Sequence, residues 1–343
     1  MKPSREKRDH RLEGTRNEAR RSRSLTVVSA SRSGKLRLLR MFGVWVVLAV
    51  MLIYGVLATH GFTTRTNVTS LLALSPPLII AALGQTFVIA VGGLDLSVGM
   101  LMGLVGVLSV GLMSNNDALF VPVVLLSLCL GLAVGSFNGE MVARTNMSPI
   151  LLTFGMLFVL EGASYLYTLQ SIAPIPPLYQ DLESRQLGSI PLVTFAWIVL
   201  AILAWVVLAR TRLGQHIRAI GGDAKSALKA GIPIRSVQVV AYAVSGLSGA
   251  IAGLLLASRL QVGYPLAGQG MELNSIVAVL IGGTPYGGGR ANIAGSVGGA
   301  LLLNLLTNLL DLRRVTPYVE QVIVGLFTVA AITLYSSRRR RSG

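Results

Sequence analysis

Long apolar runs, separated by short polar stretches, fill the chain from about residue 41 to residue 335. Most of the runs are close to the roughly 20 apolar residues that a helix needs to cross a bilayer core about 30 Å thick. Backbone polar groups inside lipid must be hydrogen-bonded within their own segment, so the runs have to be helical. Charged residues make up only 13% of the chain, against roughly 25% in soluble domains. We therefore predict an all-α, polytopic transmembrane helix bundle in a cell inner membrane.

The apolar runs predict about ten spans, and two features predict irregular segments within them. Pro76 and Pro77 lie inside the second run, where proline removes helix hydrogen bonds and should break or kink the helix. Glycines recur on single helix faces, as at Gly99, Gly103 and Gly106, and we expect them to allow close helix packing. The expected spans are residues 41–59, 68–91, 97–113, 120–142, 149–169, 191–209, 237–257, 273–285, 291–310 and 317–335.

Basic residues give the chain a formal net charge of +16, and their positions predict its orientation. They cluster at residues 1–40, 210–235 and 338–341, next to spans, which is typical of cytoplasmic segments rather than of a nucleic-acid-binding surface. An even number of spans places both termini on one side, so we expect both in the cytoplasm. The predicted parts are a basic disordered tail at 1–36, a transmembrane domain at 37–337 with a cytoplasmic loop at 210–236, and a basic tail at 338–343.

A first motif, LGQTFVIAVGGLDLSVG at residues 83–99, reads as a corner between two helices. Gly92 and Gly93 end the first helix, Asp95 is a suitable N-cap for the next, and Ser97 falls in its first turn. An acid at this position also meets the positive end of the helix dipole. Two interpretations stay open: Asp95 only caps the helix, or it takes a direct part in gating or transport.

A second motif, RLGQHIRAIGGDAKSALKAGIP at residues 212–233, is the long basic stretch between two spans. Gly221 and Gly222 should divide it into two short helices, Asp223 can cap the second, and Gly231 followed by Pro233 should end it. Two short helices joined by a glycine hinge suit the docking of a soluble partner. An ordinary cytoplasmic loop could have the same composition.

A third motif, ELNSIVAVLIGGTPYGGGRANIAGSVGGALLL at residues 272–303, contains glycines at 282–283 and 287–289 that interrupt an apolar stretch. They predict a broken helix or re-entrant turn, which membranes tolerate only where protein or a water-filled cavity surrounds it and which is common near transport pathways. The glycine run lacks the Gly-Lys-Ser/Thr of a phosphate-binding loop. We therefore expect no ATP site, no catalytic residues, no cofactor and no metal site.

In this order, the three motifs resemble the permease family of ribose-type (carbohydrate uptake class 2) ABC importers, over about residues 41–336. The resemblance implies a permease that works beside a second copy or a sister permease, with separate ATPase subunits and an extracytoplasmic solute-binding protein that delivers a ribose-like sugar. It implies an ATPase-coupling role for Arg212, Leu213, Gly214, Ala219, Gly221, Gly222, Asp223, Ala230, Gly231 and Ile232. The translocation or gating candidates are Gly93, Asp95, Ser97, Glu161, Glu272, Asn274, Gly282, Gly283 and Thr284.

Some residues differ from the family pattern. Asn274 stands where an Asp is common, and Glu161 stands where an Arg is often found. A carboxylate in a span is costly unless it is paired or hydrated, so we expect Glu161 to line the pathway or to pair with Arg144 or Arg259. Two other functions stay open: an ABC permease for a nucleoside or a furanone-type signal, and an ion-coupled secondary transporter, which would need acids or histidines deep in its spans.

Overall fold

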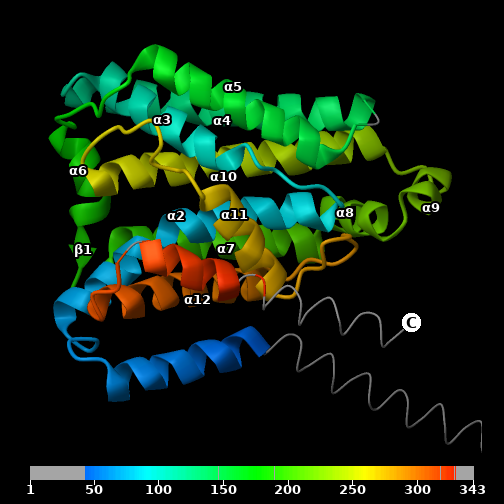
Figure 1. The fold of residues 1–343 in the computed structure, drawn as a ribbon. Helices are drawn as coiled ribbons and strands as arrows, with labels where there is room; N and C mark the ends of the chain where they lie inside the picture. Colours follow the sequence, from blue (N-terminus) through cyan, green and yellow to red (C-terminus); the bar gives the residue numbers. More distant parts are fainter. Residues whose placement is uncertain (1–42, 146, 189, 317, 328, 330–343) are drawn as a thin grey trace, which may run out of the picture. The chain divides into compact units, whose positions relative to one another are not determined.

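The computed structural model describes residues 43–145, 147–188, 190–316, 318–327 and 329, and these residues are mostly helical (Figure 1). The basic tails predicted at 1–36 and 338–343 lie outside the described residues. The described residues from Val44 onward form one compact unit.

Each of the ten predicted apolar runs contains a helix. In the described part of the chain, six helices are long and apolar enough to cross a membrane: α2 (Arg65–Ala90), α4 (Phe120–Arg144), α5 (Pro149–Tyr167), α7 (Leu192–Arg210), α10 (Ile234–Leu260) and α12 (Ile293–Leu312). The shorter apolar helices are Gly43–Ala58, α3 (Val98–Met113), α11 (Met271–Ile281) and Tyr318–Phe327. The prediction of a polytopic helix bundle is therefore confirmed.

Short elements lie at the two ends of the bundle (Figure 1). At one end are α6 (Pro177–Ser184) and an antiparallel hairpin of β1 (Gln186–Leu187) and β2 (Ile190–Pro191), and a 3-10 turn, η1 (Asp117–Leu119), precedes α4. At the other end are α8 (Arg212–Gly222) and α9 (Ala224–Lys229). The sequence did not predict α6 or the hairpin, because they lie in a polar segment without an apolar repeat.

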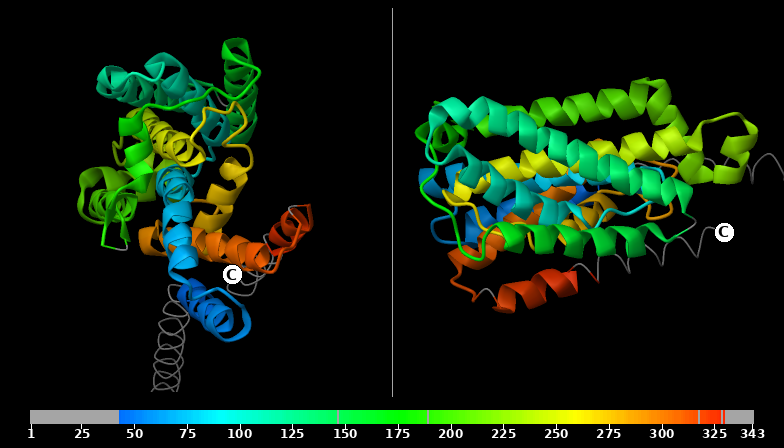
Figure 2. Two further views of the ribbon diagram at one scale, coloured as in Figure 1. Left: turned by 90° about the vertical axis from the view of Figure 1, so that its left-hand side faces the viewer. Right: turned by 90° about the horizontal axis from the view of Figure 1, so that it is seen from above.

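The helices α2 and α10 form the centre of the bundle (Figures 1 and 2). In its most apolar stretch α2 is 83% buried and α10 is 56% buried, whereas α5 and α7 are only 17% buried. α2 packs against α7, α10, α11 and α12, and α10 also packs against α3 and α4. Side chains such as Leu151 on α5 and Leu203 on α7 are exposed, as expected for apolar helices that face lipid.

The proline pair does not break α2. Pro76 and Pro77 both lie inside one continuous helix, so of the predicted break or kink the break does not occur. Proline leaves a carbonyl of the preceding turn without its donor, but membrane helices tolerate this defect where neighbouring helices surround it. Every residue of α2 from Ser75 to Ala90 is buried. The pair therefore lies where α2 enters the protein interior.

Glycines bring the backbones of α4 and α10 into direct contact. Gly131, Gly135 and Gly139 are spaced four residues apart, so they lie on one face of α4. A Cβ atom on any of them would overlap backbone atoms of α10 between Val239 and Gly246. We call this contact the α4–α10 seam. Small residues permit close packing of this kind between membrane helices.

Candidate functional site

The loop between α2 and α3 forms a buried hub around Asp95. Its Oδ1 atom accepts hydrogen bonds from the N atom of Ser97 at 3.0 Å and from Ser97 Oγ at 2.6 Å, and its Oδ2 atom accepts from Ser245 Oγ at 2.8 Å. The N-cap residue of α3 is Ser97, so the predicted capping role of Asp95 is wrong. Asp95 instead holds the N-cap residue of α3 against α10. We call Asp95, Ser97 and Ser245 the Asp95 hub.

Polar side chains from three helices tie this loop in place. Asn138 Nδ2 on α4 donates to Ser97 Oγ at 2.9 Å, and Thr153 Oγ1 on α5 accepts from a loop N–H at 3.1 Å. Tyr242 Oη on α10 donates to a loop carbonyl at 3.1 Å and lies against Gly93, where a Cβ atom would overlap it. Because Asp95 is buried and both its oxygens are paired, this geometry favours anchoring over contact with a solute.

The second motif folds into two capped helices, α8 and α9, as predicted. Thr211 Oγ1 accepts from the N atom of Gly214 at 3.3 Å and caps α8. Asp223 Oδ1 accepts from the N atom of Lys225 at 3.0 Å, and Oδ2 accepts from Ser226 Oγ at 2.6 Å. The Ser226 hydroxyl, followed by the Lys225 N–H, lowers the pKa of Asp223. The ionised carboxylate therefore caps α9.

One side of the α8–α9 segment is buried and the other is open. Ile217 and Ile220 belong to the main apolar core. On α9, Leu228 is 63% exposed and lies between the exposed residues Lys225 and Lys229. Of the residues predicted to couple to an ATPase, one is buried (Gly214), three are half-buried (Leu213, Gly221 and Ile232), and the others are exposed: Arg212, Ala219, Gly222, Asp223, Ala230 and Gly231.

The three motifs meet where α2 ends. The N–H of Gly289, in the loop between α11 and α12, donates to Ala90 O at 3.0 Å. Gly221, in the last turn of α8, lies against both of these groups, and a Cβ atom on it would overlap them. Gly288 has a φ of 76° and lies against Gly92 and Gly221. We call Ala90, Gly92, Gly221, Gly288 and Gly289 the glycine junction. A side chain in its centre would push three segments apart.

The third motif is interrupted between α11 and α12, as predicted. The turn over residues 282–292 is held by Asn292, whose Nδ2 donates to Gly282 O at 2.8 Å and whose side chain caps α12. Thr284 is buried, and its Oγ1 accepts from the N atom of Asn292 at 3.0 Å. Gly283 has a φ of 93°, a conformation that favours glycine. These contacts give the turn a defined shape beside the glycine junction.

Glu161 is half-buried on α5, and its expected ion pair is absent from the described residues. Arg144 instead pairs with Glu140, with 2.5 Å between Nε and Oε1. Arg259 pairs with Glu183, with 3.8 Å between Nη1 and Oε1. The predicted pairing of Glu161 with either arginine is therefore wrong.

Glu272 is buried in the first turn of α11. Its Oε1 atom accepts from the N atom of Gly270 at 3.1 Å, and its Oε2 atom has no hydrogen-bond partner among the described residues. The carboxylate lies against Gly99 of α3, where a Cβ atom would overlap it. The Glu272 side chain thus packs directly against the backbone of α3.

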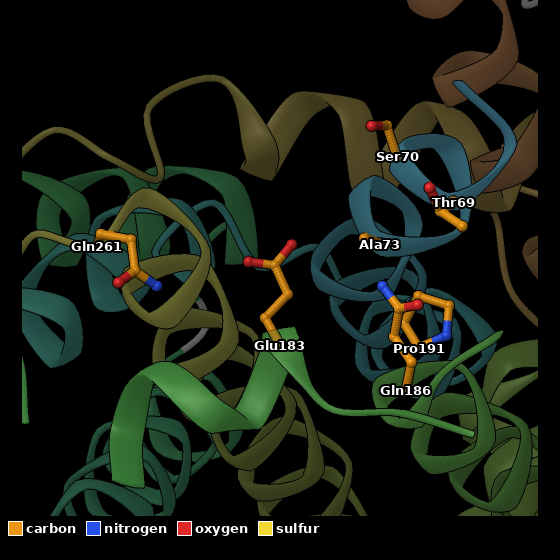
Figure 3. Close-up of a pocket in the computed structure, with 7 residues that line it drawn as sticks. All are labelled: Thr69, Ser70, Ala73, Glu183, Gln186, Pro191 and Gln261. Atoms are coloured by element: carbon orange, nitrogen blue, oxygen red, sulfur yellow. The ribbon is translucent and has the colours of Figure 1, made fainter. Parts of the chain in front are cut away.

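Two cavities lie along α2. The first, which we call the hairpin cavity, has a volume of about 230 Å³ and lies beside the β1–β2 hairpin (Figure 3). The Glu183 carboxylate stands in it, between Gln261 on one side and the side chains of α2 and the hairpin on the other (Figure 3). Burial raises the pKa of Glu183, and the nearby Arg259 opposes this shift. The lining residues are Thr69, Ser70, Ala73, Glu183, Gln186, Pro191 and Gln261.

The second cavity, also of about 230 Å³, lies between α2, α10, α11, α12 and the helix Tyr318–Phe327, and we call it the bundle cavity. Of the translocation candidates predicted from the sequence, Asn274 is the one that lines it. The other candidates lie in or beside the Asp95 hub, on α5, at the start of α11 or in the 282–292 turn. The cavity's polar side chains are Arg259, Asn274, Asn304, Thr307 and Glu320.

A polytopic helix bundle with polar cavities between its helices and a basic two-helix segment at one end has the architecture of a membrane transport protein. A family model described as branched-chain amino acid transport system / permease component matches residues 67–332. The chain therefore belongs to the ABC importer permease family, whose members are inner-membrane proteins distinct from the ATP-hydrolysing subunits. Among the described residues, no group of three or more His, Cys, Asp or Glu could hold a metal ion.

Curated relatives resemble the chain over nearly their whole length. The D-allose transport system permease protein of Escherichia coli (strain K12) is 30% identical over 295 residues, which cover 85% of this chain and 90% of the relative. The ribose import permease of Bacillus subtilis (strain 168) is 32% identical over 302 residues, 86% of this chain and 92% of the relative. The galactose/methyl galactoside import permease of E. coli (strain K12) is 29% identical over 318 residues, 87% and 95% respectively. No solved structure matches the chain.

Proposed function

We propose that this chain forms the membrane pathway of an ABC importer for a sugar. The relatives described above are named for ribose, allose and galactose transport, and their similarity extends over most of this chain. The motifs contain no phosphate-binding loop, so the energy has to come from separate ATPase subunits. The observation that carries the proposal is the glycine junction, which connects a basic surface segment to two elements of the bundle interior.

We assign ten spans to the chain, with both termini and the α8–α9 segment in the cytoplasm. The excess of basic residues in α8 and α9 supports this orientation, because such segments are retained on the cytoplasmic side. The hairpin end then faces outward. With 26 residues, α2 is about 39 Å long, so it reaches from the hairpin cavity to the glycine junction across the whole membrane.

The open side of α8 and α9 is the docking surface for the ATPase. Leu228 offers an exposed apolar side chain, and Lys225 and Lys229 offer charges that suit an acidic partner surface. A displacement of α8 at this surface reaches Gly221, whose backbone touches both α2 and the 282–292 turn. ATP-driven movement of the docked subunit would therefore move the two interior elements together.

A solute-binding protein would deliver the solute at the hairpin end, and a second permease would stand beside this one as a copy or a sister chain. We assign the gating movement to the 282–292 turn with Gly282, Gly283 and Thr284, because the turn adjoins the glycine junction. The Asp95 hub then holds α3 and α10 in place, and Glu272 lies at the contact between α3 and α11. This assignment gives the sequence-predicted candidates different roles.

Purification of the tagged permease from its native membrane tests the proposal. We expect an ATPase subunit in stoichiometric amounts, with hydrolysis stimulated by a secreted solute-binding protein. Leu228→Asp should remove the ATPase from the complex. Leu187→Asp is the matched control, because Leu187 is 65% exposed on β1 at the opposite end. If Leu228→Asp retained the ATPase as well as Leu187→Asp, the docking surface would be wrongly assigned.

The alternative functions predict other outcomes in the same preparation. A non-sugar ABC permease would copurify with an ATPase, but its binding protein would select a nucleoside or another signal molecule. An ion-coupled transporter would be isolated without an ATPase and would move solute down an ion gradient. Either result would overturn the corresponding part of the proposal.

A further inference from the structure

Two buried hydrogen-bond donors at the bundle cavity have no partner. Arg259 Nη1 and Asn304 Nδ2 are both buried and unbonded among the described residues, and both side chains line the cavity. The 3.8 Å between Arg259 Nη1 and Glu183 Oε1 allows an ion pair but is too long for a hydrogen bond. Buried donors without partners are costly. A ligand that accepts hydrogen bonds would therefore be stabilised in this cavity.

The remaining polar lining both donates and accepts hydrogen bonds. Asn274 offers an amide, Thr307 a hydroxyl and Glu320 a carboxylate. Leu78 and Leu256 add apolar surface from α2 and α10. A solute with hydroxyl groups on a hydrocarbon ring matches this mixture, since its hydroxyls can pair with the polar groups while its C–H surface contacts the leucines.

The size and charge of the cavity narrow the class of solute. Its volume of about 230 Å³ is below the roughly 300–1,000 Å³ of sites for drug-sized ligands, so one small ring fits and a longer saccharide does not. The positive charge of Arg259 is opposed by Glu183 and Glu320 at the two cavities. Because these two carboxylates offset the charge of Arg259, an anionic solute has no electrostatic advantage over a neutral one.

We infer that the bundle cavity holds one uncharged, polyhydroxylated solute of monosaccharide size during transport, with Arg259 and Asn304 as its principal hydrogen-bond donors. The inference rests on the proposed function, which supplies the transport role, and adds the place where the solute is held. Polar side chains within membrane spans are costly and are typical of pathways. This explains why polar residues from several helices gather at one cavity.

The Glu183–Arg259 pair stands between the two cavities. Glu183 lines the hairpin cavity and Arg259 lines the bundle cavity, and the consecutive residues Ala73 and Leu74 of α2 line one each. A solute that enters from the hairpin side therefore meets Glu183 first and Arg259 next. Because the two side chains are not hydrogen-bonded to each other, Arg259 can turn to a solute hydroxyl without breaking a hydrogen bond.

Uptake by the complete importer tests the role of the lining residues, with radiolabelled D-ribose, D-allose and D-galactose as probes. We expect Asn304→Leu to reduce uptake at least tenfold and Thr307→Val to reduce it several-fold, because each removes a hydrogen bond to the solute. The matched control is Thr194→Val on α7, which removes a buried, unbonded hydroxyl that belongs to neither cavity. ATP hydrolysis stimulated by the binding protein should stay within twofold of wild type in all three variants.

Failure of the inference is distinct from failure of the proposed function. If the wild type transports one of the sugars and Asn304→Leu and Thr307→Val transport it equally well, the bundle cavity is not the holding site. If the wild type transports none of the three sugars with ATP, the proposed function is overturned, and with it the sugar class of the solute. Loss of stimulated hydrolysis in Asn304→Leu would also contradict the inference, because the cavity would then act in coupling.

Cysteine labelling tests the cavity without relying on transport. In a Cys129→Ala background, we expect a charged methanethiosulfonate reagent to modify Asn304→Cys and the same sugars to slow the reaction at least threefold. Leu203→Cys is the control, because this residue is 55% exposed on α7 and should face lipid, out of reach of a charged reagent. No labelling of Asn304→Cys, or labelling that none of the sugars slows, would overturn the inference.

Discussion

Two neighbouring glycines at the end of α8 allow a direct test of the glycine junction. A Cβ atom on Gly221 would overlap Ala90 O and the N atom of Gly289, whereas a Cβ atom on Gly222 would have no atom within 4 Å. Gly221→Ala and Gly222→Ala therefore make the same chemical change one residue apart, and only the first forces α8 away from α2 and the 282–292 turn.

The expected difference in stability follows from packing and helix propensity. Inserting a methyl group into a closely packed contact costs about 1–3 kcal/mol. Replacing an unobstructed helical glycine with alanine gains up to about 1 kcal/mol. Because both glycines lie in α8, this gain is common to the two variants, and Gly221→Ala should be about 1–3 kcal/mol less stable than Gly222→Ala. The thermal unfolding midpoints of the purified complexes would measure this difference.

Gly221→Ala should impair the coupling of ATP hydrolysis to solute uptake more strongly than it lowers the stability of the complex. In the reconstituted importer, we expect Gly221→Ala to keep its ATPase subunit and its ATP hydrolysis but to lose at least tenfold in solute uptake, because α8 no longer touches the two interior elements. Gly222→Ala should resemble the wild type in both assays. Equal uptake by the two variants would refute the view that movement passes through the glycine junction.

Three further predictions concern stability. Asp95→Ala should destabilise the protein by at least about 2 kcal/mol in thermal unfolding, because it leaves buried donors of the hub unpaired. Asp95→Asn keeps one acceptor oxygen and should lose less stability. An equal loss of stability in the two variants would argue against the hub. Asp223→Ala should lower the unfolding midpoint at pH 7. The difference from wild type should shrink as the pH falls below the ordinary carboxyl pKa of 3.8, because only the ionised form makes the capping bonds. A difference that persisted at low pH would contradict this. Gly99→Ala should lower the stability by about 1–3 kcal/mol, because its Cβ atom would overlap Glu272. Gly106→Ala, whose Cβ atom would lie 3.5 Å from its nearest neighbour, should be neutral or slightly stabilising. Equal unfolding midpoints for the two variants would show that α3 can shift.

The sequence predicted the helices well because their signal is local. Apolar length alone located ten runs that each contain a helix, and glycine spacing correctly predicted close packing, as at Gly103, where a Cβ atom would overlap the carbonyl of Pro265. Of the break or kink expected at Pro76 and Pro77, the break does not occur, because neighbouring helices, which the sequence of α2 does not show, stabilise a proline-containing helix. The ridge of Gly131, Gly135 and Gly139 was overlooked, although its four-residue spacing was visible.

The candidate site was harder to predict because its parts are distant in the sequence. The motifs correctly predicted the division of α8 from α9 and the interruption after α11, since caps and glycines act locally. They could not show that Gly221 touches Ala90 and Gly289, a contact set by tertiary packing. Among the residues that line the bundle cavity, the motifs pointed only to Asn274. The polar residues Asn304 and Thr307 within an apolar run were the signal that could have predicted the rest.

The α4–α10 seam also determines which parts of the bundle can move independently. Where two helices touch through their backbones, there are no intervening side chains that can change rotamer and let one helix slide past the other. We therefore expect α4 and α10 to travel as a single rigid body, together with α3, which the Asp95 hub ties to α10 and the Asn138–Ser97 hydrogen bond ties to α4. Relative motion is then confined to the boundary between this body and the pair α11–α12. Distance measurements by paired spin labels should find fixed separations across the seam in every nucleotide state and changing separations across that boundary.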